Sequence, residues 1–305
     1  MATLPLNIDK AHIRELSNRS NLWGAWLTFH VWATIIISGA VFVIWPNPLT
    51  FVFAVLMIGS RQHGMAVLMH DAAHGILFRN RKINDFVGHY VLGAPYGGDM
   101  HSYRKYHLQH HKYTQTDIDP DLPLSAKFPV SRHSMMRKFL RDITGLTFIR
   151  LRIAAHKMRQ GQSAGMRGTD AFQKSSDRPT IISNVMIFSV LAVMGLWWAY
   201  FALWLLPLMT WFWVVLRLRN IAEHAMTARN DSPLEHARTT KANLIERILF
   251  APYWVNYHVE HHAYMYVPCY NLPKLHRTML ARGYGGKMEM KPGYVSVLKT
   301  ATTPA

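Results

Sequence analysis

Nine of the 18 histidines in this chain lie in four short clusters, and imidazole is a common metal ligand in proteins. On a helix, residues spaced i, i+3 and i+4 share one face, so each cluster presents its imidazoles in one direction. The clusters are His70 with His74, His107 with His110 and His111, Asn220 with His224, and His258 with His261 and His262. This pattern predicts that four helical segments supply the ligands of one buried metal centre.

The number and type of these ligands restrict the metal. Nine imidazoles exceed what one ion accepts, but two ions would receive four or five nitrogens each. The one cysteine, Cys269, excludes a thiolate cluster and an internal disulfide, and we expect it to serve packing. Structural zinc usually takes four ligands, so two iron ions with room for oxygen fit better. Asn220 lies four residues before His224 and is a candidate oxygen ligand, directly or through water.

Several carboxylates are candidates to accept a hydrogen bond from the second ring nitrogen of a ligand histidine. They are Asp71, Glu223, Glu260, Asp117, Asp119 and Asp121. Helix capping and turn formation are the alternative roles, above all around Pro120, and the sequence leaves both open. The nine other histidines show no clustering and are expected to pack or to lie at the surface. Among them, His63 and His101 are the candidates to support the site.

Two long runs without Asp, Glu, Lys or Arg must position these clusters: 22–45 and 181–216. A transmembrane helix needs about 20 apolar residues, so 22–45 is predicted as one span and 49–69 as a second. Arg61 in the second span is expected to point inward or to lie near the far membrane face, because a lipid-facing charge is costly. As one helix the second run would be about 54 Å long. We therefore expect a hairpin with spans over 181–198 and 202–218 and a bend near Trp198–Ala202.

The predicted fold class is an all-α integral membrane protein, with four transmembrane helices in two hairpins and a helical cytoplasmic cap that holds a histidine-rich di-metal site. The membrane domain covers 22–280, with the cap formed by 70–180 and 219–280. Residues 1–21 and 281–305 are predicted as a cytoplasmic N-terminal segment and C-terminal tail. Lys and Arg are absent from the two expected outer turns and dense in 132–178. The positive-inside rule then places both termini and the metal site in the cytoplasm, at the inner membrane if the source is bacterial.

The remaining segments and the charge agree with a membrane protein. Residues 86–96 are too short to cross and are expected either to lie along the interface or to re-enter it. The Gly-, Ser- and Arg-rich segment 158–178 is predicted as a loop. No cleavable signal is expected. The net charge of +17 is typical of positive-inside bias and attraction to anionic lipid headgroups. No nucleic-acid partner is expected, because no recognised basic–aromatic module is present.

The residues around the clusters carry a resemblance to a known family. Gly75 follows the first cluster, Asp119–Pro120–Asp121 follows the second, and the last is followed by Val-Pro-Cys-Tyr-Asn-Leu-Pro at 267–273. Over about 22–280 the chain resembles the membrane fatty acid desaturase and hydroxylase superfamily. The resemblance implies four spans, a helical cytoplasmic cap, two irons, molecular oxygen and an external electron donor. It also implies that the nine clustered histidines bind the irons and that Asn220 reaches one iron through water.

The chain departs from some branches of that superfamily. The first cluster has three intervening residues, where animal-type acyl-CoA desaturases have four, and the last begins with His258 instead of the Gln of front-end desaturases. No His-Pro-Gly-Gly haem motif and no Gly-x-Gly-x-x-Gly fingerprint are present. Electrons are therefore expected from a separate ferredoxin, rubredoxin or cytochrome with its reductase. A basic cytoplasmic face would suit an acidic carrier.

The function implied is that of an O2-dependent oxidoreductase acting on a lipid acyl chain, most simply a fatty acyl desaturase that introduces a C=C bond. The alternatives with the same metal centre are a hydroxylase, ketolase or oxidative decarboxylase acting on a fatty acid, carotenoid or other hydrophobic substrate. A membrane metal transporter is the non-enzyme alternative, and it predicts ligands spread through the membrane depth. The basic residues that could hold a headgroup or carrier phosphate, or merely supply positive-inside charge, are Arg79, Arg81, Lys82, Arg104 and Lys105.

Overall fold

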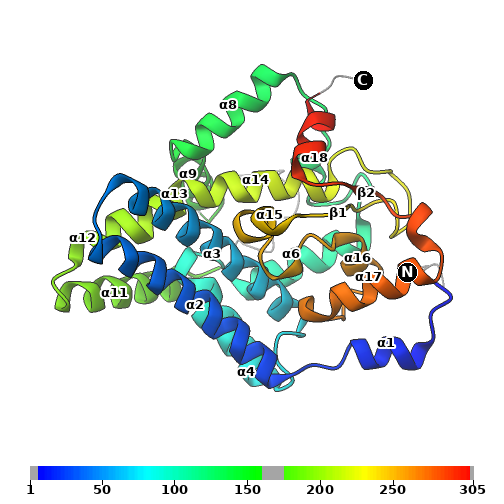
Figure 1. Ribbon diagram of the computed structural model, residues 1–305, viewed down its shortest axis with the longest axis horizontal. Helices are drawn as coiled ribbons and strands as arrows, with labels where there is room; N and C mark the ends of the chain where they lie inside the picture. Colours follow the sequence, from blue (N-terminus) through cyan, green and yellow to red (C-terminus); the bar gives the residue numbers. More distant parts are fainter. Residues whose placement is uncertain (1–5, 160–174, 303–305) are drawn as a thin grey trace.

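The computed structural model describes residues 6–159 and 175–302, and this part of the chain is almost entirely helical (Figure 1). The described strands are β1 (Thr239–Thr240) and β2 (Met290–Lys291), which form one short parallel pair. The predicted all-α class is therefore confirmed. Most of the predicted loop 158–178 falls at 160–174, outside the described residues.

Two long helices, α2 (Asn21–Ile44) and α3 (Pro48–His74), form the first apolar hairpin. The Ser20 side chain caps α2, and Asn47 caps α3 through a capping box with Thr50. Gly75 ends α3 in a left-handed conformation, with φ of 75°. Because α3 continues to His74, the first histidine cluster lies on the last turns of a helix, as predicted.

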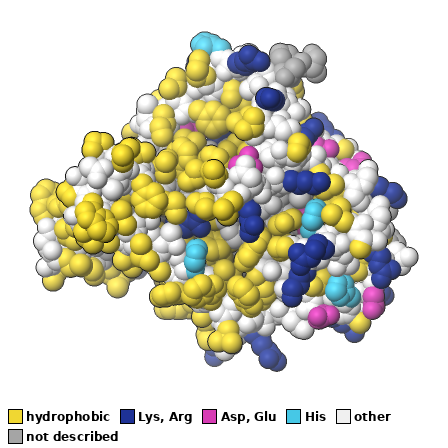
Figure 2. Space-filling model, viewed as in Figure 1, with side chains coloured by type: hydrophobic (Ala, Val, Ile, Leu, Met, Phe, Trp, Pro, Cys, Tyr) yellow, Lys and Arg dark blue, Asp and Glu magenta, His cyan; other side chains and the backbone are white. Residues whose placement is uncertain are grey.

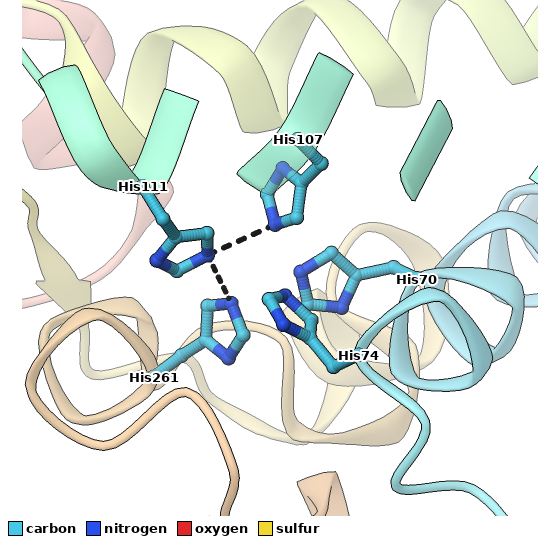
Figure 3. A group of neighbouring side chains, drawn as sticks. All are labelled: His70, His74, His107, His111 and His261. Atoms are coloured by element: carbon cyan, nitrogen blue, oxygen red, sulfur yellow. Dashed lines mark hydrogen bonds between the residues drawn. The ribbon is translucent and has the colours of Figure 1, made fainter. Parts of the chain in front are cut away.

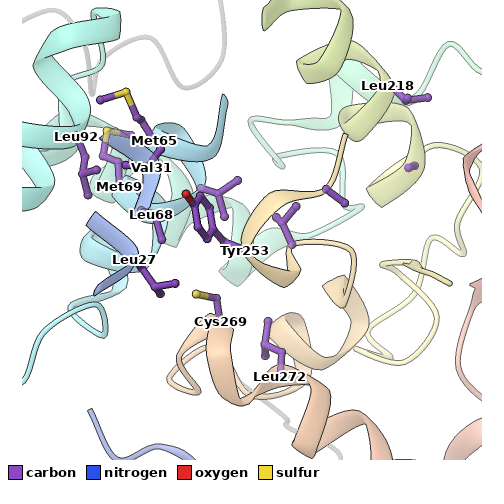
Figure 4. Packing of buried hydrophobic residues seen from close by; sticks show 14 of the residues in the cluster. Leu27, Val31, Met65, Leu68, Met69, Leu92, Leu218, Tyr253, Cys269 and Leu272 are labelled. Carbon is purple, nitrogen blue, oxygen red and sulfur yellow. The ribbon is translucent and has the colours of Figure 1, made fainter. Parts of the chain in front are cut away.

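The two helices of this hairpin pack through a continuous apolar seam (Figure 4). Leu27 and Val31 of α2 are buried, as are Met65 and Leu68 of α3. Gly24 lets α2 approach the segment that follows α3, since a Cβ there would lie 2.4 Å from the backbone oxygen of Leu77. The seam fixes where the end of α3, and with it the first histidine cluster, lies against α2.

The second apolar run folds into α11 (Arg178–Val193) and a longer helical segment that reaches His224. The longer segment consists of α12 (Trp197–Ala199), the π-helix η2 (Tyr200–Leu205), α13 (Leu206–Met209) and α14 (Trp211–His224). The turn lies at Met194–Leu196, where Gly195 adopts φ of 74°. The bend predicted near Trp198–Ala202 is therefore wrong by several residues, because glycine and not tryptophan allows the left-handed turn. The predicted boundaries 181–198 and 202–218 shift accordingly.

Three helical segments are long and apolar enough to cross a membrane: Asn21–Ile44, Pro48–His74 and Trp197–His224. The 16-residue α11 is apolar but shorter than a typical span. None of its residues is buried, and the side chains of Ile181, Val185 and Val193 are largely exposed. Hydrophobic side chains gather over the end of the molecule formed by α11, α12 and their neighbours, whereas Lys and Arg gather over the opposite part (Figure 2). This is the surface of a membrane protein. Arg61 is almost fully buried, so it points inward as expected.

Shorter elements build the rest, which we call the cap (described residues of 75–159 and 225–302). Its helical elements are α4 (Arg81–Phe86), η1 (Val87–Gly93), α5 (Ala94–Tyr96), α6 (Met100–Tyr113), α7 (Leu122–Ser125), α8 (Arg132–Ile143), α9 (Leu146–Arg159), α15 (Leu244–Leu249), η3 (Pro252–Trp254), α16 (His258–Ala263), η4 (Cys269–Asn271), α17 (Leu272–Ala281), η5 (Tyr284–Gly286) and α18 (Tyr294–Ala301). The short α1 (Lys10–Leu16) precedes the membrane helices.

The C-terminal residues are part of the cap and not a free tail. Residues 290–291 pair with β1, and Tyr294 and Val297 of α18 are buried. Packed structure therefore continues past position 281, because the apolar side chains of α18 cover a packed surface, and the predicted domain division stays a prediction. The ends of the described chain both lie away from the turn between α11 and α12 (Figure 1).

Candidate metal centre

Four helices that are distant in sequence bring the predicted ligands together. The last turns of α3 carry His70 and His74, and the end of α14 carries Asn220 and His224. The clustered histidines of α6 are His107, His110 and His111, and those of α16 are His258, His261 and His262. On each helix the i, i+3 and i+4 spacing turns the imidazoles to one side, as the sequence predicted. The nine rings form two adjoining groups.

The first group contains five imidazoles that face one another (Figure 3). Its members are His70, His74, His107, His111 and His261, each with one ring nitrogen within 4.8 Å of those of the others. The Nε2 atom of His111 lies 3.0 Å from that of His107 and 2.9 Å from that of His261. Both ring nitrogens of His74 are buried without a hydrogen-bond partner. Such orphaned imidazole nitrogens are what a bound cation would satisfy.

The second group lies beside the first and contains four imidazoles. His110, His224 and His262 approach one another within 4.8 Å. His258 completes the group, because its Nε2 atom lies 2.8 Å from Nε2 of His224 and 3.2 Å from Nε2 of His262. The two groups adjoin where the rings of His111 and His262 stack with centroids 4.4 Å apart. The division into five and four is the one that two ions require.

The short separations between ring nitrogens fit imidazoles that share an ion. Two nitrogens bound to a common ion at about 2.1 Å lie about 3.0 Å apart at a right angle and about 3.4 Å apart at a tetrahedral angle. Five pairs of Nε2 atoms within the groups lie 2.8, 2.9, 3.0, 3.2 and 3.2 Å apart. The residues present therefore fit two imidazole-bound transition-metal ions.

Burial keeps most of these rings neutral, which is the state that binds metal. Removal from water, reinforced by neighbouring imidazoles, holds the pKa values of His107, His111, His258, His261 and His262 well below the usual range. Burial alone would also lower the pKa of His110, but the carboxylates of Asp121 and Asp119 raise it overall.

The second ring nitrogens have partners that orient the second group. Nδ1 of His110 lies 2.8 Å from Oδ1 of Asp119, and Nδ1 of His224 lies 3.1 Å from the carbonyl oxygen of His236. Both acceptors favour a proton on Nδ1 and leave Nε2 free to face the metal. The Glu223 carboxylate lies farther away, 3.7 Å from Nδ1 of His258.

The other predicted carboxylates divide between orienting and structural roles. Asp71 lies 3.4 Å from His70 Nδ1 and also accepts a hydrogen bond from the backbone N–H of Cys269, a buried packing residue as expected. Asp121 lies 3.6 Å from His110. Glu260 binds Thr239 and His276, neither of which belongs to the nine. Asp117 is largely exposed and pairs with Arg229, so its proposed role at the site is wrong. The turn after α6 directs it to solvent.

Asn220 lies on α14 one turn before His224 and is half-buried. Its placement on the same helix face follows from the four-residue spacing. A contact between Asn220 and a metal stays a prediction.

The fatty acid desaturase family model matches residues 46–293, which include all four clusters. The chain belongs to the fatty acid desaturase family. It is similar to the dihydrorhizobitoxine desaturase of Bradyrhizobium elkanii, with 26% identity over 83% of this chain and 70% of the relative. It is 24% identical to the sn-1 oleoyl-lipid 12-desaturase of Synechocystis sp., over 81% of this chain and 75% of the relative. The human sphingolipid delta(4)-desaturase/C4-monooxygenase is 26% identical over 79% of this chain and 68% of the relative.

This desaturase-family chain also uses residues that the sequence pattern did not single out. Arg238 is 1% exposed, and its guanidinium donates to the carbonyl oxygens of Ala222 and Ala225 at the end of α14, at 3.2 and 2.8 Å. Its Nε donates to Glu289 at 3.0 Å. Thr239 donates to Glu260 and accepts from the backbone N–H of Val259. The segment 236–239 thus ties the end of α14 to α16.

A second such contact lies inside the membrane helices. Arg219 pairs with Glu223 and places a guanidinium nitrogen 2.8 Å from Nε2 of His63. His63, one of the two unclustered histidines singled out as supporting candidates, is therefore linked through Arg219 to Glu223 beside His258. His101 lies at the exposed side of α6, with its ring 4.9 Å from that of His89. The one sequence signal for this network was the presence of charged residues in helices that are otherwise apolar, because such charges are expected to face inward.

Proposed function

We propose that this protein is an O2-dependent lipid desaturase that binds two iron ions between α3, α6, α14 and α16. The five-histidine group would hold one ion and the four-histidine group the other, with Asn220 beside the second. The observation that carries the proposal is the convergence of nine imidazoles in two adjoining, largely buried groups. Iron accepts imidazole ligands and supports oxygen chemistry.

When bound, the irons would supply the oxidising power that removes hydrogen from an unactivated carbon. The residues of this chain hold and orient that centre. Asp119 and the His236 carbonyl fix two ligand rings through their Nδ1 atoms. Burial of the histidines keeps bulk water away from the site. The protein thereby determines which carbon of a hydrophobic substrate comes within reach.

We further propose four spans, with α11 as the fourth. A helix without a buried residue needs an apolar surrounding to cover Ile181, Val185 and Val193. Pairing α11 with the α12–α14 segment gives two hairpins. Both termini, the cap and the metal centre would then lie in the cytoplasm, consistent with the Lys- and Arg-rich segments. A lipid substrate would enter from the bilayer, and electrons would come from an external carrier and its reductase.

The substrate class proposed is an acyl lipid, which the name of the Synechocystis relative supports. The name of the human relative combines a desaturase with a monooxygenase, so an oxygenated product is the second candidate. This second class includes hydroxylation, ketone formation and oxidative decarboxylation. Mass spectrometry separates the two candidates, because desaturation removes two hydrogens whereas hydroxylation adds an oxygen. A metal transporter is disfavoured, since the nine histidines gather at one place and not along the spans.

The test is untargeted lipid profiling of cells that express the wild-type protein, a His261→Ala variant, or a His133→Ala variant. His133 lies on the exposed surface of α8 and serves as the matched control. We expect a lipid lighter by two hydrogens with the wild type and the control, and its loss with His261→Ala. A protein that accumulates iron in sealed vesicles but forms no new double bond in any lipid class would contradict the proposal.

A further inference from the structure

One of the four ligand-bearing helices has a face open to solvent. The ligand-bearing part of α3 (58–74) and all of α14 and α16 contain only buried or half-buried residues. In α6 five residues are exposed: His101, Lys105, Leu108, Gln109 and Lys112. Among the described elements that carry the nine histidines, α6 is therefore the one that separates the metal centre from water by a single helix.

Four of these residues form a stripe at positions i, i+3, i+4 and i+7, which we call the outer face of α6 (Lys105, Leu108, Gln109 and Lys112). Leu108 is 40% exposed and lies between the two lysines. The sequence of α6 contains no Asp or Glu, so no carboxylate of this helix neutralises the stripe. The outer face thus offers an apolar centre flanked by positive charge.

The outer face is connected to the metal centre by very few covalent bonds. Leu108 is joined directly to His107 of the five-histidine group, and Gln109 is joined directly to His110 of the four-histidine group. An electron that arrives at this surface therefore has the shortest covalent path to either group. Entry through α3, α14 or α16 would require crossing other packed elements.

The proposed reaction needs such an entry point. Desaturation removes two hydrogens from the lipid, and reduction of O2 to two water molecules takes up four electrons and four protons. The lipid supplies two of each, so two electrons and two protons must come from elsewhere. This inference rests on the proposed function.

We propose that the outer face of α6 is the docking site of a small acidic one-electron carrier protein. Lys105 and Lys112 would attract the carrier's carboxylates, and Leu108 would be covered at the centre of the contact. A single exposed leucine fits a small, transient interface of the kind redox partners form. A lipid surface is the less favoured occupant, because α15 offers it a larger apolar set in Leu244, Ile245 and Ile248.

The probe is a plant-type [2Fe–2S] ferredoxin, which is acidic, added to the iron-loaded full chain in lipid nanodiscs. The variants are Lys105→Glu with Lys112→Glu, and the milder Lys105→Gln with Lys112→Gln. The matched control is Lys241→Glu with Lys274→Glu, since these lysines are exposed and lie outside α6. Iron content and unfolding temperature confirm that each variant is folded.

We expect the charge-reversed pair on α6 to weaken ferredoxin binding about tenfold or more and to reduce the dependence of binding on salt. The Gln pair should weaken binding less, and the control pair should leave it near the wild-type value. Lipid turnover driven by dithionite with a small mediator should be the same in the wild type and in the Lys241 and Lys274 control pair. In the α6 pairs the same assay separates the two roles of Lys105: a fall in this turnover would assign Lys105 to a lipid headgroup and overturn the docking site.

Three outcomes would overturn the docking site. They are equal weakening by the control pair, no weakening by the α6 pair, and no binding of ferredoxin to the wild type. Loss of dithionite-driven lipid turnover in the α6 pair, with ferredoxin binding unchanged, would assign the face to lipid instead. Failure of the proposed function is read separately, as absence of an oxidised lipid under dithionite with the mediator.

Discussion

The imidazole of His110 and the carboxylate of Asp119 lie 2.8 Å apart, and both side chains are almost completely buried. The same carboxylate accepts backbone N–H bonds from Gln115 and Asp121, so the turn after α6 holds it in place. The pair therefore links the course of the backbone to the direction in which Nε2 of His110 points. A ring fixed in this way is already oriented for a metal ion before the ion binds.

Replacing Asp119 with Asn should lower metal affinity. The amide keeps the shape but loses the charge that favours a proton on Nδ1, and changes of this kind typically cost about 10- to 100-fold in affinity or activity. Iron retention against a competing chelator measures the effect. Asp117→Asn is the control, since Asp117 is 87% exposed and lies only two residues away. Equal retention by wild type and Asp119→Asn would show that the carboxylate does not support the site.

Replacing Arg238 with alanine should lower the free energy of unfolding far more than the same change at a surface arginine. Its removal leaves the carbonyl oxygens of Ala222 and Ala225 and the carboxylate of Glu289 without their buried partner. Each buried carbonyl oxygen left without a donor typically costs about 1–3 kcal/mol, whereas Glu289 is 33% exposed and can turn to water. Arg229→Ala, which breaks the exposed pair with Asp117 and a 3.3 Å hydrogen bond to the carbonyl oxygen of Gln115, should cost about 1 kcal/mol or less. Thermal unfolding midpoints in detergent compare the two variants.

An Arg238→Lys variant refines this test. Lysine keeps the charge but lacks the forked guanidinium that reaches α14 and Glu289 together. The unfolding midpoint of Arg238→Lys should therefore lie between those of the wild type and Arg238→Ala. If the unfolding midpoint of Arg238→Ala were no lower than that of Arg229→Ala, the contacts of Arg238 with α14 would not contribute to stability.

The directions of the ligand side chains could be predicted from the sequence because helical periodicity is local. The spacing of His107, His110 and His111 places them on one face of α6 whatever else the chain does. Hydrophobic runs likewise predicted α2 and α3 closely. The predicted position of the turn between α11 and α12 was wrong, because the run from Ile181 to Leu216 carries no charge to mark a turn, and the structure turns at its one glycine, Gly195.

The contacts between distant segments could not be predicted in this way. Nothing local distinguishes Asp119 from Asp117, yet one faces His110 and the other faces solvent. Arg238 is an ordinary basic residue in the sequence, and its role depends on α14 and on Glu289, 51 residues later. The division of nine histidines into five and four also follows from how four helices meet, which periodicity does not contain.

The close approach of α2 to the segment that follows α3 predicts opposite effects for two glycines of α2. An alanine at Gly24 would place its Cβ 2.4 Å from the backbone oxygen of Leu77, so that segment must move away from α2, at a cost of about 1–3 kcal/mol. An alanine at Gly39 would make ordinary contact with Leu203, at 3.7 Å, and should stabilise α2 by about 0.5–1 kcal/mol. Unfolding midpoints of Gly24→Ala and Gly39→Ala should therefore lie on opposite sides of the wild type. Equal midpoints would contradict the tight crossing at Gly24.

His224 and His236 contribute to the site in different ways, one through its side chain and the other through its backbone carbonyl. The ring of His224 lies in the four-histidine group, whereas His236 supports it through its main-chain oxygen, 3.1 Å from Nδ1 of His224. His224→Ala should therefore lose iron, and His236→Ala should retain it, because alanine keeps the carbonyl. Metal analysis of the purified proteins gives the iron-to-protein ratio directly.

The iron content of His236→Ala also tests whether His236 is itself a metal ligand. The ring of His236 lies 5.3 Å from that of His262, and its buried Nε2 has no hydrogen-bond partner, so it is the nearest described histidine that could extend the four-histidine group. Because its Nδ1 lies 3.3 Å from the carbonyl oxygen of Asn230, its ring is held by the loop before β1. We expect the iron content of His236→Ala to match that of the wild type. A fall as large as that in His224→Ala would make His236 a tenth ligand and change the division from five and four to five and five.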